Sequence, residues 1–120
     1  MLKFDHLVIP VSDLGRSRAW YVETLGMTVE FEVAERRSVA LQDTGGFTIF
    51  LQQSGEGAPV RGVALYFQVD AVDTSFQELS ARGVTFAHPP TKTFWGYGAE
   101  LADPDGYLIR LWDERSMKER

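Results

Sequence analysis

Residues 62–83, GVALYFQVDAVDTSFQELSARG, decide the fold because they repeat the pattern of residues 4–26, FDHLVIPVSDLGRSRAWYVETLG. In the later stretch, an apolar run predicts a strand over residues 62–69. Apolar residues three and four positions apart then predict a helix over about residues 72–82. The earlier stretch predicts the same two elements in the same order.

Capping residues mark the ends of both predicted helices. Asp70 is expected to cap the second helix, and Gly83 follows its last turn. In the first half, Asp13 or Ser12 is the expected N-cap, and Gly26 stands just beyond the helix. The two halves therefore begin with the same strand and helix unit.

Further strand candidates follow each helix, so that the whole succession occurs twice. The other predicted elements are a strand over 4–11, a helix over about 14–25, and strands over 28–33, 37–42, 48–52, 85–87, 97–102 and 107–112. Residues 54–59 have the composition of a linker, and residues 103–106 that of a tight turn. The charged tail after Asp113 is expected to be frayed.

This repeat predicts the fold class, which is α+β. Residues 1–120 are expected to form one domain made of two βαβββ modules, of about residues 1–57 and 62–120. The aliphatic face of each sheet is expected to pack on the amphipathic helices.

Composition excludes several classes of protein. The 17 acidic and 12 basic residues give a net charge of −5, which disfavours nucleic acid as a partner. The chain has no cysteine, so disulfides and thiolate metal sites are excluded. No apolar run is long enough to cross a membrane, and no signal sequence opens the chain. We therefore expect a cytoplasmic protein.

Residue parity along the strands separates an aliphatic face from an aromatic and polar one. The second face carries His6, Phe50, Gln52, Tyr66, Gln68, Arg110 and Trp112. Large aromatic rings with a few polar groups are typical of a small-molecule site. Residues 89–98, which include Trp95, are expected to form a loop that covers this site. His88 is expected to be a surface residue.

Several motifs together resemble the vicinal oxygen chelate superfamily. They are Asp5-His6-Leu7, the helix end Leu25-Gly26, and Asp103-Pro104-Asp105-Gly106-Tyr107. This superfamily includes glyoxalases, extradiol dioxygenases, fosfomycin resistance enzymes and bleomycin-binding resistance proteins. Trp95-Gly96 resembles the bleomycin-resistance-like branch. The resemblance implies an incompletely closed eight-stranded barrel-like sheet around a cleft, with helices outside, and a homodimer.

The resemblance also implies a divalent metal held by His and Glu side chains, which this sequence does not provide. His6 matches a ligand position, whereas Phe50, Ala64 and Arg110 stand at the other three. A guanidinium stays cationic and cannot bind a metal ion. We therefore expect no metal cofactor, and a divalent metal is the alternative.

Polar groups on the same face suggest what the site does instead. If residues 103–106 close a hairpin, Glu100 lies opposite Arg110 and forms a cross-strand ion pair. Arg110 then serves as a strut or offers donors to an anionic or carbonyl-bearing ligand. The candidate catalytic groups are His6, Glu100 and Arg110, although the sequence shows no group that orients His6.

Three functions are compatible with these residues. The leading hypothesis is a metal-free protein that sequesters an aromatic or polycyclic small molecule through His6, Phe50, Gln52, Tyr66, Gln68, Trp95, Arg110 and Trp112. The alternative is a lyase, isomerase or dioxygenase of the same superfamily, acting on a small oxygenated substrate. A third hypothesis is that the aromatic face buries a partner chain.

Overall fold

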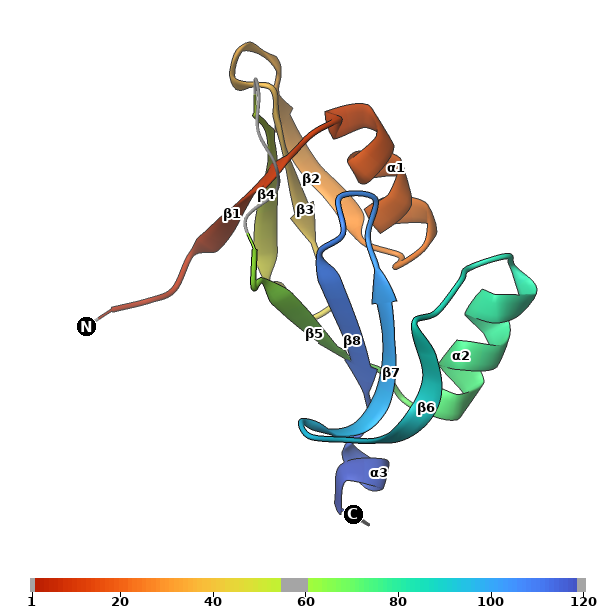
Figure 1. Ribbon diagram of the computed structural model, residues 1–120. Coiled ribbons are helices and arrows are strands. Elements are labelled where there is room, and N and C mark those ends of the chain that lie inside the picture. Colours follow the sequence, from red (N-terminus) through yellow and green to blue (C-terminus); the bar gives the residue numbers. More distant parts are fainter. Residues whose placement is uncertain (1, 55–60, 119–120) are drawn as a thin grey trace. The chain divides into compact units, whose positions relative to one another are not determined.

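Each half of the chain folds as a βαβββ module in the computed structural model, which describes residues 2–54 and 61–118 (Figure 1). The chain forms two compact units, residues 1–60 and 61–120. The predicted linker at residues 54–59 lies, apart from Ser54, outside the described residues.

The elements follow one another in the same order in both units. The first contains β1 (His6–Val11), α1 (Leu14–Glu23), β2 (Thr28–Val33), a 3₁₀ turn (Ala34–Arg36), β3 (Ser38–Gln42) and β4 (Thr48–Gln53). The second contains β5 (Ala64–Gln68), α2 (Val72–Ala81), β6 (His88–Thr93), β7 (Gly96–Ala102), β8 (Leu108–Trp112) and α3 (Glu114–Lys118). No helix among the described residues is long and apolar enough to cross a membrane.

Sheet topology is identical in the two units, which confirms the predicted α+β class and the two tandem βαβββ modules. The strand order is β1-β4-β3-β2 in the first sheet and β5-β8-β7-β6 in the second. In each sheet the first strand pairs parallel with the last, and the other pairs are antiparallel. The predicted enclosure of one cleft by both sheets stays a prediction.

One face of each sheet packs on its helix, as residue parity predicted. In the first unit α1 packs against β3 and β4, where Leu41 and Leu51 are fully buried. In the second unit α2 packs against β6 and β7, and Leu101 and Ile109 are buried. The residues on the opposite face of each sheet are therefore not needed to pack the helix.

Three predictions about the elements of the second unit were wrong. The second strand of this unit is β6 at His88–Thr93, and residues 85–87 form no strand. The expected covering loop over residues 89–98 is therefore a hairpin made of β6 and β7. The tail after Asp113 begins with the short helix α3.

The cap of α2 also differs from the prediction. Its N-cap residue is Ala71, and Asp70 makes no capping bond. Instead, the buried Asp113 side chain accepts a hydrogen bond from the Val72 amide at 2.7 Å through Oδ2. Its Oδ1 accepts a second one, from the Ser116 amide at 2.6 Å. One carboxylate thus caps both α2 and α3. The Asp13 cap of α1 is confirmed, since Asp13 Oδ1 accepts from the Arg16 amide.

Asp113→Asn should lower the free energy of unfolding by about 1–2 kcal/mol at pH 7. Burial raises the pKa of Asp113, but the hydrogen bonds from Val72 and Ser116 outweigh burial and lower this pKa. A pKa lower in the folded than in the unfolded state gives stability that is present above about pH 4. This stability is lost as the pH falls through the folded-state pKa. The difference in the free energy of unfolding between wild type and variant should therefore become smaller toward pH 2. Urea unfolding followed by circular dichroism measures this difference.

Asp70→Asn is the matched control for this experiment, because Asp70 is exposed and caps nothing. It should leave the unfolding midpoint within about 0.5 kcal/mol of wild type. Equal losses in the two variants would show that Asp113 does not cap α2.

Candidate functional site

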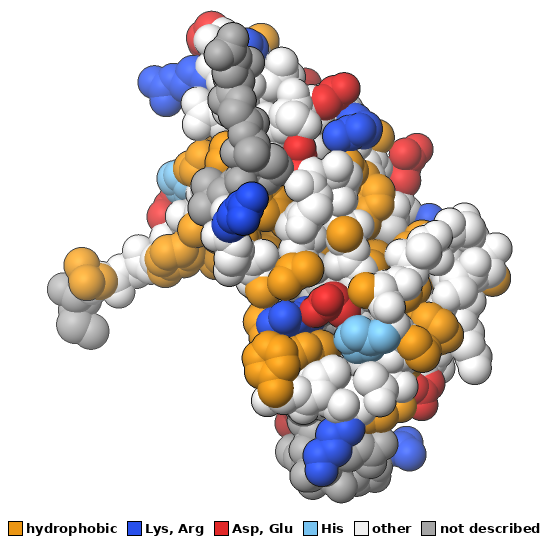
Figure 2. Space-filling model, in the orientation of Figure 1, with side chains coloured by type: hydrophobic (Ala, Val, Ile, Leu, Met, Phe, Trp, Pro, Cys, Tyr) orange, Lys and Arg blue, Asp and Glu red, His pale blue; other side chains and the backbone are white. Residues whose placement is uncertain are grey.

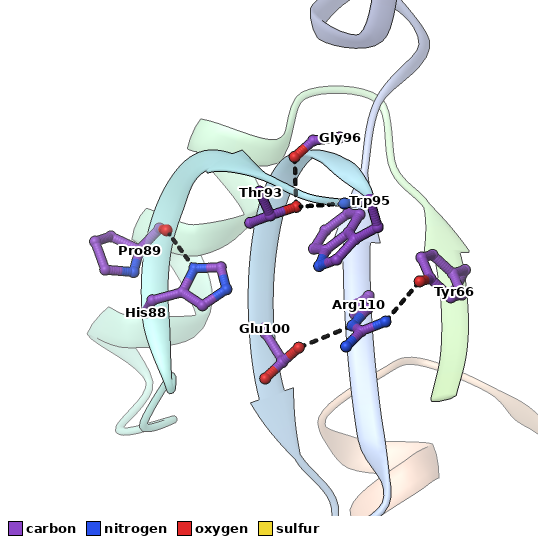
Figure 3. A network of polar contacts seen from close by, with 8 residues as sticks. All are labelled: Tyr66, His88, Pro89, Thr93, Trp95, Gly96, Glu100 and Arg110. Carbon is purple, nitrogen blue, oxygen red and sulfur yellow. Dashed lines mark hydrogen bonds and ion pairs between the residues drawn. The ribbon is translucent and has the colours of Figure 1, made fainter. Parts of the chain in front are cut away.

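A row of four polar side chains crosses the second sheet from edge to edge. His88 on β6 pairs with Glu100 on β7, Glu100 pairs with Arg110 on β8, and Arg110 pairs with Tyr66 on β5. Directly paired residues project from the same face of a sheet, and the four side chains lie together in Figure 3. His88, expected at the surface, is partly buried and belongs to this row.

Arg110 is held at both ends of its guanidinium. Nε donates to Glu100 Oε1 at 2.8 Å, and Nη1 donates to the Tyr66 hydroxyl at 2.6 Å (Figure 3). The Glu100 hydrogen bond raises the pKa of Arg110, burial opposes this rise, and the Tyr66 bond adds to it. The expected cross-strand ion pair is therefore confirmed, with side-chain exposures of only 12% for Arg110 and 19% for Glu100.

Three aromatic rings surround this guanidinium. The Arg110 Cζ atom lies 5.4, 5.3 and 5.5 Å from the ring centroids of Tyr66, Phe94 and Trp95. These distances are within the range of cation–π attraction. Trp95 also meets Tyr66 edge to face, with centroids 5.5 Å apart. Tyr66, Phe94, Trp95, Glu100 and Arg110 are called the Arg110 cluster below.

The tight turn between β6 and β7 positions Trp95. The Thr93 hydroxyl donates to the Gly96 carbonyl at 2.6 Å and accepts from the Trp95 amide at 3.2 Å. Gly98 then lets the indole lie directly on the β7 backbone. A Cβ atom at Gly98 would overlap both the Leu111 carbonyl oxygen and the Trp95 ring.

Further predicted residues lie next to the cluster on the same sheet. Gln68 and Trp112 pair with each other, two residues along from the Tyr66–Arg110 pair. Because side chains two residues apart share a face, they extend the same surface. In Figure 2 hydrophobic side chains gather over this unit beside charged groups and a histidine.

The predicted residues of the first unit line a pocket of about 220 Å³. His6, Phe50 and Gln52 lie on its wall with Arg36 and Ser38. The His6 ring packs against Phe50, with ring centroids 4.4 Å apart. The predicted site residues thus fall into one group in each unit.

Asp5 supplies a hydrogen-bond partner for His6, which the sequence did not reveal. His6 Nδ1 lies 2.7 Å from Asp5 Oδ2. Because an ionised carboxylate only accepts hydrogen bonds, Nδ1 carries the proton and Nε2 is left to accept or release one. The adjacency of Asp5 and His6 was the available signal, but neighbours on a strand normally point to opposite faces.

The metal implied by the resemblance does not fit these residues. The Phe50 ring covers one side of the His6 ring, and Arg110 is a cation already paired with Glu100. Ala64 has no donor atom in its side chain. Within the described part of either unit, no three His, Cys, Asp or Glu side chains lie close enough together to hold a metal ion.

Comparisons with known proteins agree with the architecture. A family model described as the Glyoxalase/Bleomycin resistance protein/Dioxygenase superfamily matches residues 3–111. A search of curated proteins found no match.

Solved structures share the fold over nearly the whole chain. A member of that superfamily from Sphaerobacter thermophilus is 27% identical, with a TM-score of 0.78 over 94% of this chain and 98% of that one. An integron cassette protein from V. cholerae is 27% identical, with a TM-score of 0.75 over 95% and 96% of the two chains. A virulence protein from Salmonella typhimurium is 24% identical, with a TM-score of 0.73 over 94% and 97%. The last likeness concerns the fold alone.

Proposed function

The chain belongs to the Glyoxalase/Bleomycin resistance protein/Dioxygenase superfamily, and we propose that within it this protein binds a small aromatic molecule without a metal. The observation that carries this proposal is the Arg110 cluster, in which three rings gather around one hydrogen-bonding side chain. Flat, conjugated molecules bind well to such surfaces because ring faces and edges attract one another.

Exposure of the rings supports a binding role. Tyr66 is 48% exposed and Phe94 is 91% exposed, although both are large apolar side chains. Burying such rings against a ligand removes apolar surface from water, which stabilises a complex by roughly 25 cal/mol per Å². Arg110 and Glu100 supply the few polar groups that give a mostly apolar site its specificity.

Trp95→Ala should weaken the binding of a planar ligand by about 1–3 kcal/mol, because the indole is a large part of the stacking surface. The probes are neutral, anionic and cationic naphthalene derivatives, titrated into the protein while tryptophan fluorescence and heat are recorded. Trp20→Phe is the control. Trp20 lies on α1 in the first unit, edge-on to Tyr21. Absence of binding by every probe would refute the proposal.

The Asp5–His6 pair favours a second candidate function, a lyase or isomerase that moves a proton without a metal. Nε2 of His6 is the accepting atom, and Asp5 fixes the ring. The test is deuterium exchange of hydroxyacetone in heavy water, followed by NMR. His6→Ala should abolish any acceleration that wild type gives, whereas an inactive wild type removes this candidate.

The proposal includes two further properties, namely that the protein forms a homodimer and that it is located in the cytoplasm. Sedimentation equilibrium would test the first, because a dimer doubles the mass of 13.5 kDa.

A further inference from the structure

Arg110 keeps hydrogen-bonding capacity that the fold does not use. A guanidinium has five N–H groups. The bonds to Glu100 and Tyr66 use two of them, through Nε and Nη1, so three have no partner among the described residues. These three are the two on Nη2 and the second one on Nη1.

Nη2, which carries two of the three unused N–H groups, is accessible to solvent. Among the described residues, no nitrogen of Arg110 is both fully buried and without a hydrogen-bond partner. Arg110 Nη2 therefore has some contact with solvent, although the side chain as a whole is only 12% exposed. A ligand that enters among the rings of the cluster reaches these groups directly.

Glu100 and Tyr66 hold the Arg110 guanidinium in one orientation before any ligand binds. The 2.8 Å bond at Nε and the 2.6 Å bond at Nη1 hold the guanidinium at two of its nitrogens, between the rings. A held side chain loses little entropy when a ligand binds. Glu100 and Arg110 together carry no net charge. The attraction between Arg110 and a ligand is therefore short-ranged and depends on hydrogen bonds.

A carboxylate matches the unused groups better than a neutral oxygen does. Its two oxygens accept two N–H groups of one guanidinium side by side, and a charge-assisted hydrogen bond is about twice as strong as a neutral one. The protein's net charge of −5 opposes an anion. That field is screened beyond about 8 Å at physiological salt, whereas the contact with Arg110 is direct.

We propose that the ligand of the Arg110 cluster is a planar aromatic carboxylate, with its carboxylate on Nη1 and Nη2 of Arg110 and its ring against Tyr66, Phe94 and Trp95. The proposal rests on the binding function above and adds the charge of the ligand. It also explains the position of Arg110: a fixed cation stands where the resemblance implies a carboxylate, so the site accepts an anion instead of a metal ion.

The test compares 2-naphthoate with 2-naphthamide, which have the same ring and nearly the same shape but differ in charge. Both are titrated into the full chain by calorimetry at pH 7. Wild type should bind the carboxylate about tenfold more tightly than the amide, the difference expected between charge-assisted and neutral hydrogen bonds.

Two variants isolate the role of Arg110. The double variant Arg110→Met with Glu100→Gln removes both charges, which avoids leaving a poorly solvated carboxylate unpaired, and should bind the two probes equally. Arg110→Lys retains the charge but loses the planar pair of donors, so the preference should fall several-fold. Arg16→Gln removes a positive charge from an exposed position on α1 and should leave the preference unchanged. Circular dichroism confirms that each variant is folded.

The outcomes separate this proposal from the binding function. Equal binding of the two probes by wild type would overturn the assignment of a carboxylate and leave the aromatic binding function standing. A tenfold preference that survives in the double variant would also overturn the role of Arg110. Failure of both probes to bind would overturn the binding of aromatic ligands and this proposal with it.

Discussion

Ile109→Ala should lower the free energy of unfolding by about 2–5 kcal/mol, the usual cost of a cavity left by a buried isoleucine. Ile109 is fully buried on β8, where it pairs with Leu65 on β5 and Leu101 on β7. Because β8 has a strand on each side, the neighbouring backbones are fixed and fill the space only in part. Guanidinium unfolding followed by circular dichroism measures the loss.

Trp112→Ala is the matched control on the same strand. Trp112 projects from the opposite face of β8 and is only partly buried. Its removal should cost much less stability than the loss of Ile109, and it should weaken the binding of naphthalene probes. If the two variants were equally destabilised, the assignment of one face to the core and the other to a ligand would be wrong.

Gly98→Ala should destabilise the protein by about 1–3 kcal/mol and displace the Trp95 indole, because an added methyl group has no room. The new Cβ would overlap the Leu111 carbonyl oxygen on β8, which is part of the backbone and cannot swing away. Near-ultraviolet circular dichroism reports on the packing of the indole, and urea unfolding reports on stability. Binding of naphthalene probes should fall together with the indole signal.

Gly45→Ala is the control for the methyl group itself. An added Cβ there would meet only the Asp43 side chain, at an ordinary contact distance of 3.5 Å. Stability should stay within about 0.5 kcal/mol of wild type. An unchanged indole signal in Gly98→Ala would show that Trp95 does not lie on the β7 backbone.

Local pattern identified most of the secondary structure. The strand predicted at residues 28–33 is β2 without change, and the helix predicted at 72–82 is α2 at Val72–Ala81. The period of the apolar residues is a local property, so it needs no information from distant parts of the chain. Alternation along a strand likewise puts Ile49 and Leu51 on one face of β4, where both are buried.

Strand β6 was not predicted from the sequence because it contains Pro89 and Pro90. Proline cannot donate to a sheet ladder and normally argues against a strand. β6 is the edge strand of its sheet, and its pairing with β7 is irregular between His88 and Thr91. The two prolines fall in this irregularity, where an edge strand tolerates missing N–H groups. The hairpin that carries Trp95 was therefore predicted as a loop.

The cap of α2 was not predicted because the capping residue is far from the helix along the chain. Asp70 precedes the helix and fits the local rule, whereas Asp113 lies 41 residues from the amide that it binds. These groups come together only because the end of β8 lies beside the start of α2 in the folded chain.

Sequence alone determined which residues share a strand face, because alternation along a strand fixes the direction of each side chain. The register between strands was decided only by the tertiary structure. His88, Glu100, Arg110 and Tyr66 come from four strands, and their alignment in one row depends on pairings between residues up to 44 positions apart. Hydrogen bonds between strands and packing against α2 select that register, and neither is a property of any single segment.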